Sequence, residues 1–160
     1  MNFKIKKLNN GLKIFYIPFS NFSSTIIRLA IPAGSFLDKK NPGLAHITEH
    51  IVAWHIEKLA RQTSNSTWMD NHLLTHFEAG TNRKYTYFYF DIFLQDTKVV
   101  VDIFKNLLNS DIDQENIEKE KNIILSEIQD DINNDYYEKK ELLNFLGDVL
   151  GSKYPTLGTI

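Results

Sequence analysis

Two histidines and a glutamate lie in the segment from Gly43 to Trp54, which is otherwise almost wholly apolar, and this segment constrains the fold most. On a helix, His46 and His50 lie about 40° apart on one face, and Glu49 lies about 60° to the other side of His46. Burial of such ionisable groups costs on the order of several kcal/mol unless a partner replaces the lost hydration. A divalent cation shared by the two imidazoles is an effective partner.

A core helix whose histidines are simply hydrogen-bonded is the plainer interpretation, and it suits a lone histidine. The spacing His-x-x-Glu-His favours a metal, because it supplies two zinc ligands and a general base from one helix. His55 lies about 180° round the helix from His46 and is expected to be structural. A rival metal site is the pair His72 and His76 on a predicted helix from 68 to 77, although no carboxylate pattern accompanies it.

A third metal ligand is available on a second predicted helix, from 114 to 128, with Asp113 as its N-cap. Its inward face is apolar, with Ile117, Ile124 and Ile128. Glu120 and Glu127 are separated by about 20° and lie at the edge of that face. An ordinary surface helix explains the other glutamates and lysines of this segment well, but it explains Glu127 less well.

The segment His46-Ile47-Thr48-Glu49-His50, with Glu127 placed 77 residues after His50, resembles the inverted zinc motif of a known peptidase family. This is the pitrilysin, insulin-degrading-enzyme and mitochondrial-processing-peptidase family. Five further segments are similar to that family at corresponding places: Asn10–Ile14, Ala33–Ser35, Gly43–Ala45, Arg83–Thr86 and Glu118–Glu120. The resemblance covers nearly the whole chain.

The resemblance implies a zinc-dependent endopeptidase that hydrolyses short or unstructured peptides with a zinc-activated water. One zinc ion would be held by His46, His50 and Glu127. Glu49 would be the general base, accepting the proton of the water and delivering it to the leaving amine. Glu120 would assist catalysis by orienting a ligand.

The resemblance also implies an edge strand that pairs with the substrate backbone. Its residues here are Phe77, Glu78, Ala79, Gly80 and Thr81. The family usually has asparagine before the alanine, whereas this chain has Glu78. Asparagine both donates and accepts hydrogen bonds, whereas an ionised glutamate only accepts, and this difference bears on substrate positioning.

The hydrophobic pattern predicts strands at 3–8 and 12–17 joined by a turn, a strand at 24–31 in a central position of a sheet, and an aromatic strand at 83–94. Helices are predicted at 95–109 and 136–150, and the histidine helix is expected to continue through Ala60. This order indicates an α+β fold, an antiparallel or mixed sheet with helices packed on one face. We expect residues 1–160 to form a single domain that resembles one incomplete domain of a clamshell metallopeptidase.

Composition excludes several classes of protein. The chain has 160 residues, 42% hydrophobic and 24% charged, as in a soluble globular domain, and its net charge of −2 comes without a basic patch for nucleic acid. Without cysteine, a metal site has to use histidine and carboxylate. No apolar run approaches the length of a membrane span and no leader precedes the first strand, so the expected address is cytoplasmic and no membrane is expected.

The resemblance implies partners as well, because such proteins are clamshells of two or four related domains, each longer than this chain. We therefore expect a second related chain, or a homo-oligomer, to complete the peptide chamber. The alternative function is a non-catalytic peptide-binding subunit of a processing-peptidase-like complex, which binds peptides by strand addition at residues 77–81. The intact motif favours the peptidase, because a subunit that only binds peptides has no physical need for Glu49.

Overall fold

The computed structural model describes residues 3–133 except 64–67, 108, 110 and 112–115. The predicted N-cap Asp113 and the predicted helix at 136–150 therefore lie outside the described residues. The elements in chain order are β1 (Lys4–Lys7), β2 (Lys13–Tyr16), β3 (Ser24–Ile31), η1 (Ser35–Leu37), α1 (Leu44–Thr63), α2 (Trp68–His72), β4 (Leu73–Thr81), β5 (Thr86–Phe93), η2 (Leu94–Asp96), α3 (Thr97–Leu107) and α4 (Ile117–Asn133).

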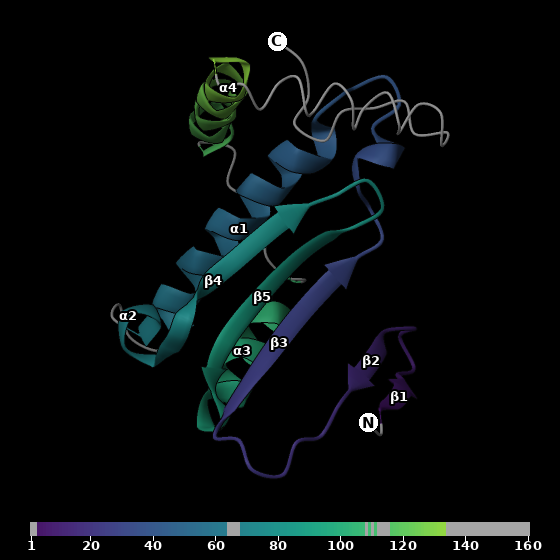
Figure 1. The fold of residues 1–160 in the computed structure, drawn as a ribbon, viewed down its shortest axis with the longest axis vertical. Coiled ribbons are helices and arrows are strands. Elements are labelled where there is room, and N and C mark those ends of the chain that lie inside the picture. The colour runs from purple at the N-terminus through teal and green to yellow at the C-terminus, as the bar shows by residue number, and fades with distance from the viewer. Residues whose placement is uncertain (1–2, 64–67, 108, 110, 112–115, 134–160) are drawn as a thin grey trace.

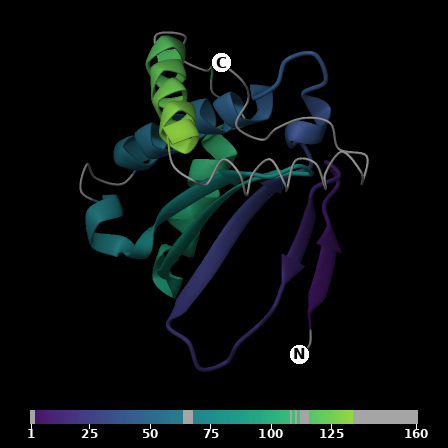
Figure 2. The ribbon, with the colours of Figure 1, turned by 45° about the horizontal axis from the view of Figure 1, so that its top comes forward.

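Three antiparallel strands form the main sheet, in the order β3-β5-β4, and β1 and β2 form a separate antiparallel hairpin. Helices α1 and α3 pack against one face of the main sheet (Figure 1). Helix α4 packs against α1 on the side away from the sheet (Figure 2). The predicted α+β fold with helices on one face of an antiparallel sheet is confirmed.

The core lies between β5 and the two helices that cover it. Phe88, Phe90 and Ile92 alternate along β5 and are fully or almost fully buried against Ile56 of α1 and Val100 of α3. Burial of each such side chain contributes roughly 1.5–3 kcal/mol. The intervening tyrosines of β5 face the opposite side of the sheet, as the two-residue period of a strand requires. None of the described helices combines the length and apolarity needed to cross a bilayer.

The predicted central position of the strand at 24–31 is wrong, because β3 pairs only with β5 among the described strands. Ile26 of β3 is 61% exposed, whereas the aromatic strand β5 has a neighbour on each side. A β-branched composition indicates that a segment suits a pleated, half-buried surface. It does not indicate whether the strand lies at the centre or at the edge of the sheet.

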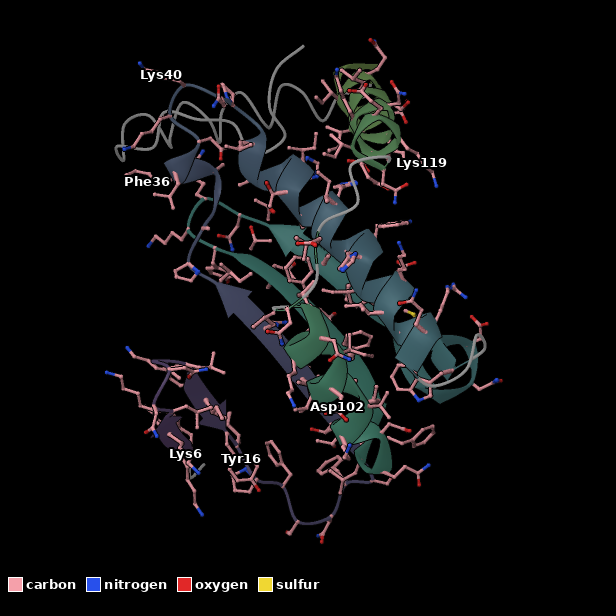
Figure 3. All side chains as sticks on the ribbon, turned by 180° about the vertical axis from the view of Figure 1, so that it is seen from behind. Lys6, Tyr16, Phe36, Lys40, Asp102 and Lys119 are labelled. Carbon is pink, nitrogen blue, oxygen red and sulfur yellow. The ribbon has the colours of Figure 1, made fainter. Side chains whose placement is uncertain are left out.

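The predicted N-terminal hairpin is confirmed. Gly11 has a φ of 88°, which favours glycine, and the side chain of Asn10 accepts a hydrogen bond of 3.1 Å from the amide of Leu12. All residues of both strands are exposed. Figure 3 shows Lys6 and Tyr16 of this hairpin standing apart from the main sheet, whereas the exposed Lys119 marks the solvent side of α4.

The predicted helix at 68–77 is wrong over its second half, because α2 ends at His72 and β4 begins at Leu73. Pairing with β5 outweighs the local helical pattern here, and the register shifts between Leu73 and Phe77, as at a β-bulge. The expected extension of the histidine helix is confirmed, since α1 continues to Thr63.

A loop between β3 and α1 ties the turn of the β4–β5 hairpin to the start of the histidine helix. The amides of Ser35 and Phe36 donate to the carbonyls of Asn82 and Arg83, at 3.1 and 3.0 Å. Gly34 lies so close to this turn that a Cβ atom would overlap its backbone.

Asp38 then caps α1, because its carboxylate oxygens accept 3.0 Å hydrogen bonds from the amides of Gly43 and Ala45. Burial raises the pKa of Asp38 above its ordinary value, and the hydrogen bonds from these amides oppose that shift. The cap therefore fixes where α1 begins and, with it, the depth at which the histidines lie.

We expect Asp38→Ala to lower the free energy of unfolding by about 1 kcal/mol, because two amides at the start of α1 lose their acceptor. Asp38→Asn keeps one acceptor oxygen and should lose less. Urea unfolding followed by circular dichroism measures both. Asp102→Ala, which removes only an exposed ion pair with Lys98, is the matched control and should leave the midpoint nearly unchanged. Equal midpoints for Asp38→Ala and wild type would contradict the cap.

Candidate metal centre

Three predicted ligands converge where α1 meets α4. The Nε2 atoms of His46 and His50 lie 3.2 Å apart, and the Oε2 atom of Glu127 lies 3.7 Å from the first and 3.6 Å from the second. The ligand atoms of these three residues all lie within 4.8 Å of one another, so the three side chains could hold one metal ion. The histidines are one helical turn apart on α1, and the packing of α4 on α1 supplies the carboxylate.

The spacing of these donor atoms fits a tetrahedral zinc ion. With bonds of about 2.0–2.1 Å, the donors around such an ion lie about 3.3–3.5 Å from one another. The three measured distances, 3.2 to 3.7 Å, bracket this range. Two imidazoles and a carboxylate with a free fourth position are also the donor set of catalytic zinc sites.

Glu120 holds His50 from the other side of its ring. Its Oε2 atom lies 3.3 Å from Nδ1 of His50, and the glutamate is buried. A carboxylate accepts hydrogen bonds, so Nδ1 carries the hydrogen in this pair and the lone pair of Nε2 is left for a metal. The predicted role of Glu120 in orienting a ligand is consistent with this contact.

Glu49 lies next to the three convergent donors and is 7% exposed. Burial raises the pKa of Glu49, and the negative charge of Glu127 acts in the same direction. A hydrogen bond with the side chain of Thr81 and the nearby His50 act against that rise. Glu49 also borders a cavity of about 220 Å³ between α1 and the sheet.

The centre is open toward solvent on the side of α4. The side chain of Glu127 is 43% exposed, whereas those of His46 and His50 are 9% and 16% exposed. A small molecule can therefore approach the donors from one direction, while the sheet closes the other side.

The predicted substrate strand lies beside this centre, because β4 is an edge of the main sheet and packs against α1. Its side chains alternate between the two faces. Phe77, Ala79 and Thr81 are paired with the β5 residues that face the helices. Glu78 and Gly80 are on the opposite face, where Glu78 accepts a hydrogen bond from the Tyr89 hydroxyl.

The rival histidine pair does not share a helix. His72 is the last residue of α2 and His76 lies in β4, so the spacing that suggested a common face has no helical basis. His55 is buried on α1, in keeping with the structural role expected from its angle.

Sequence reasoning missed two parts of the site. The hydroxyl of Thr86 lies 3.2 Å from that of Thr81 and donates a 2.7 Å hydrogen bond to the carbonyl of Ala33. The cap by Asp38 was also missed. Asp38 lies five residues before Gly43, which is outside the usual capping spacing. The contact of Thr86 with Ala33 could not be predicted, because a backbone carbonyl has no signature in a sequence.

The sequence matches the family model described as insulinase, peptidase family M16, over residues 18–146. Among curated proteins, the chain is 33% identical over 125 residues to the beta subunit of the mitochondrial-processing peptidase of Rattus norvegicus, covering 77% of this chain and 25% of the relative. The same subunit of Saccharomyces cerevisiae is 31% identical over 131 residues, with 79% and 28% covered. The chain thus spans about a quarter of the length of these relatives.

A solved structure has the same fold. The inactive domain of a peptidase M16 from Pseudomonas fluorescens aligns with 99% of this chain and 39% of its own, with a TM-score of 0.75 and 15% sequence identity. The family model alone covers most of the chain. The chain therefore belongs to peptidase family M16, the insulinase family.

Proposed function

We propose that this chain is the catalytic piece of a zinc-dependent endopeptidase that hydrolyses short or unstructured peptides. The observation that carries the proposal is the convergence of His46, His50 and Glu127 at distances of 3.2 to 3.7 Å, with Glu49 beside them. Membership of a peptidase family supports the reaction class. The names of the curated relatives, each described as a subunit, support a role as part of a larger assembly.

Each residue of the centre has a distinct task in this proposal. His46, His50 and Glu127 hold the ion, and Glu120 keeps the ring of His50 in the orientation that presents Nε2. Zinc, when bound, lowers the pKa of a water molecule toward neutrality. Glu49 would accept a proton from the attacking water and pass it to the leaving amine, because its carboxyl group is buried beside the three donors.

The substrate binds in this proposal as an additional strand beside β4. The outer edge of β4 is unpaired among the described strands, and it runs alongside the helix that carries the histidines. Main-chain hydrogen bonds to an extended peptide depend little on side chains, which suits unstructured substrates. Glu78 contributes less to this pairing than its place in the strand suggests, because its side chain lies on the opposite face of the sheet with Tyr89.

The second candidate is a non-catalytic subunit that binds peptides at the same edge. One observation favours it, since the solved structure with the same fold is described as an inactive domain. The chemistry of this chain favours the peptidase, because a buried carboxylate at Glu49 is costly and serves no purpose in a subunit that only binds.

We expect the wild-type chain to bind one zinc ion and His50→Ala to abolish stoichiometric binding, because one of three donors is lost. Glu127→Gln should weaken binding strongly, since a neutral amide replaces a charged ligand. Metal analysis after gel filtration, with titration calorimetry, measures both. His72→Ala is the matched control and should keep full zinc. Zinc retained in His50→Ala but lost from His72→Ala would move the site to the rival pair.

Glu49→Gln should keep its zinc and lose about 10²- to 10⁴-fold in the rate of peptide hydrolysis, because the amide cannot accept the proton. Hydrolysis of a quenched fluorescent peptide by the zinc-loaded chain measures the rate. Glu118→Gln, on the exposed side of α4, should change neither zinc nor rate. Unchanged turnover in Glu49→Gln refutes the general base, and loss of zinc makes Glu49 a ligand.

A partner of the same fold is part of this proposal. Large exposed apolar side chains gather on the hairpin, on β3 and on the segment between them: Ile5, Ile14, Phe15, Phe19, Phe22 and Ile26. Exposed apolar surface beside unpaired strand edges commonly marks an interface. The curated relatives are each named as a subunit, which supports a second related chain, or a second copy of this one, as the occupant.

We expect the isolated chain to associate with itself when no related chain is present, and Ile26→Lys to weaken that association, because it places a charge in the apolar surface. Gel filtration with light scattering over a concentration series measures it. Val101→Lys, at an exposed apolar position on α3, is the matched control and should associate like wild type. A stable monomer that hydrolyses peptides at low concentration would overturn this part of the proposal.

A further inference from the structure

We propose that Thr81 is the positioning residue of Glu49, and that Thr86, by donating its hydroxyl proton to the Ala33 carbonyl, leaves the Thr81 proton for Glu49. The inference rests on the proposed function, because it assigns Glu49 the role of general base. Thr81 is the last residue of β4, and its register partner Thr86 is the first residue of β5. The pair therefore lies at the end of the hairpin nearest the loop from Ala33 to Asp38.

The direction of the hydrogen bonds follows from the number of protons available. A carbonyl only accepts hydrogen bonds, so the Thr86 hydroxyl donates its one proton to the Ala33 carbonyl, at 2.7 Å. Thr86 then has no proton for Thr81, although the two hydroxyl oxygens lie 3.2 Å apart. The single proton of Thr81 is left for Thr86 or for Glu49. Glu49 lines the same cavity as Thr86, whose hydroxyl lies 3.2 Å from that of Thr81, and Thr81 is among the groups that act against the raised pKa of Glu49. A buried carboxylate is the stronger acceptor of the two.

This arrangement answers a physical need of the site. Glu49 is buried and its neighbours on α1 are mostly apolar, so its carboxylate has few hydrogen-bond donors within reach. Thr81 supplies a donor from the sheet, opposite the helix that carries Glu49. Because Thr86 and Thr81 sit on paired strands, their backbones are fixed relative to each other. Glu49 is thereby held beside the metal donors in one orientation.

The position of Thr81 on the substrate strand gives the contact a second consequence. Thr81 faces the helices, so its side chain is turned toward Glu49 while the backbone of β4 presents its free edge. One strand would then both pair with the peptide and fix the base that serves its hydrolysis. Substitution of the Thr81 side chain should therefore affect the chemical step and leave peptide binding nearly intact.

The first test uses the metal-free full chain and needs no activity. Urea unfolding is measured for wild type, Thr81→Val, Glu49→Leu and the double variant. Thr81→Val should shift the midpoint down in wild type and shift it much less in the Glu49→Leu background, where no buried carboxylate loses its donor. Thr97→Val removes a hydroxyl that bonds within its own turn, and its effect should add to that of Glu49→Leu. Additive effects of Thr81→Val and Glu49→Leu would overturn the inference.

The second test uses the zinc-loaded full chain. Thr81→Val should keep stoichiometric zinc, lower kcat by about 10- to 100-fold and leave KM nearly unchanged, while Thr81→Ser should restore most of kcat. Full activity in Thr81→Val, or no rescue in Thr81→Ser, would overturn the inference. A wild-type chain that binds no zinc or cleaves no peptide would instead refute the proposed function, and the unfolding cycle would still decide whether Thr81 holds Glu49.

Discussion

The packing of α4 against α1 is the interaction on which the rest of the site depends. It brings two carboxylates, Glu120 and Glu127, to two imidazoles that precede them by 70 to 81 residues. With Glu49, three carboxylates then lie around His46 and His50, and two of them, Glu49 and Glu120, are buried. Charges of one sign at such separations repel strongly where water is excluded, and a divalent cation among them removes most of that cost. We therefore propose that a bound divalent cation stabilises the junction of the two helices.

The sheet fixes the position at which helix α1 begins. The turn of the β4–β5 hairpin, the loop through Gly34 and the cap by Asp38 form a continuous series of contacts that ends at the start of α1. The same hairpin carries Thr81 and Thr86, and Thr86 lines the same cavity as Glu49. A change in the hairpin turn should thus reach Glu49, the proposed general base, by two routes, through the depth of α1 and through the proposed contact with the Thr81 hydroxyl.

The sequence predicts those parts of the site that depend on helical period. The common face of His46 and His50 follows from 3.6 residues per turn, as does the placement of Glu120 and Glu127 at the edge of the apolar face of their helix. The structure places these side chains together. The N-terminal hairpin follows equally well from the turn at Asn10 and Gly11.

The remaining features depend on tertiary contacts that no local pattern records. The change from α2 to β4 at Leu73 is set by pairing with β5, and the edge position of β3 is set by the order of the sheet. Side chains alternate between the two faces of β4, and its register with β5 decides that Glu78 lies on the face away from α1. The role of the Ala33 carbonyl is a property of the backbone, and side-chain identity cannot reveal it.

The ligand set of the zinc-loaded chain is the most direct test of the proposed centre, and X-ray absorption at the zinc edge measures it. The arrangement of His46, His50 and Glu127 predicts four nitrogen and oxygen neighbours at about 2.0–2.1 Å, with the outer scattering of two imidazole rings. A shell of six oxygen neighbours, or the scattering of one imidazole or none, would contradict the site.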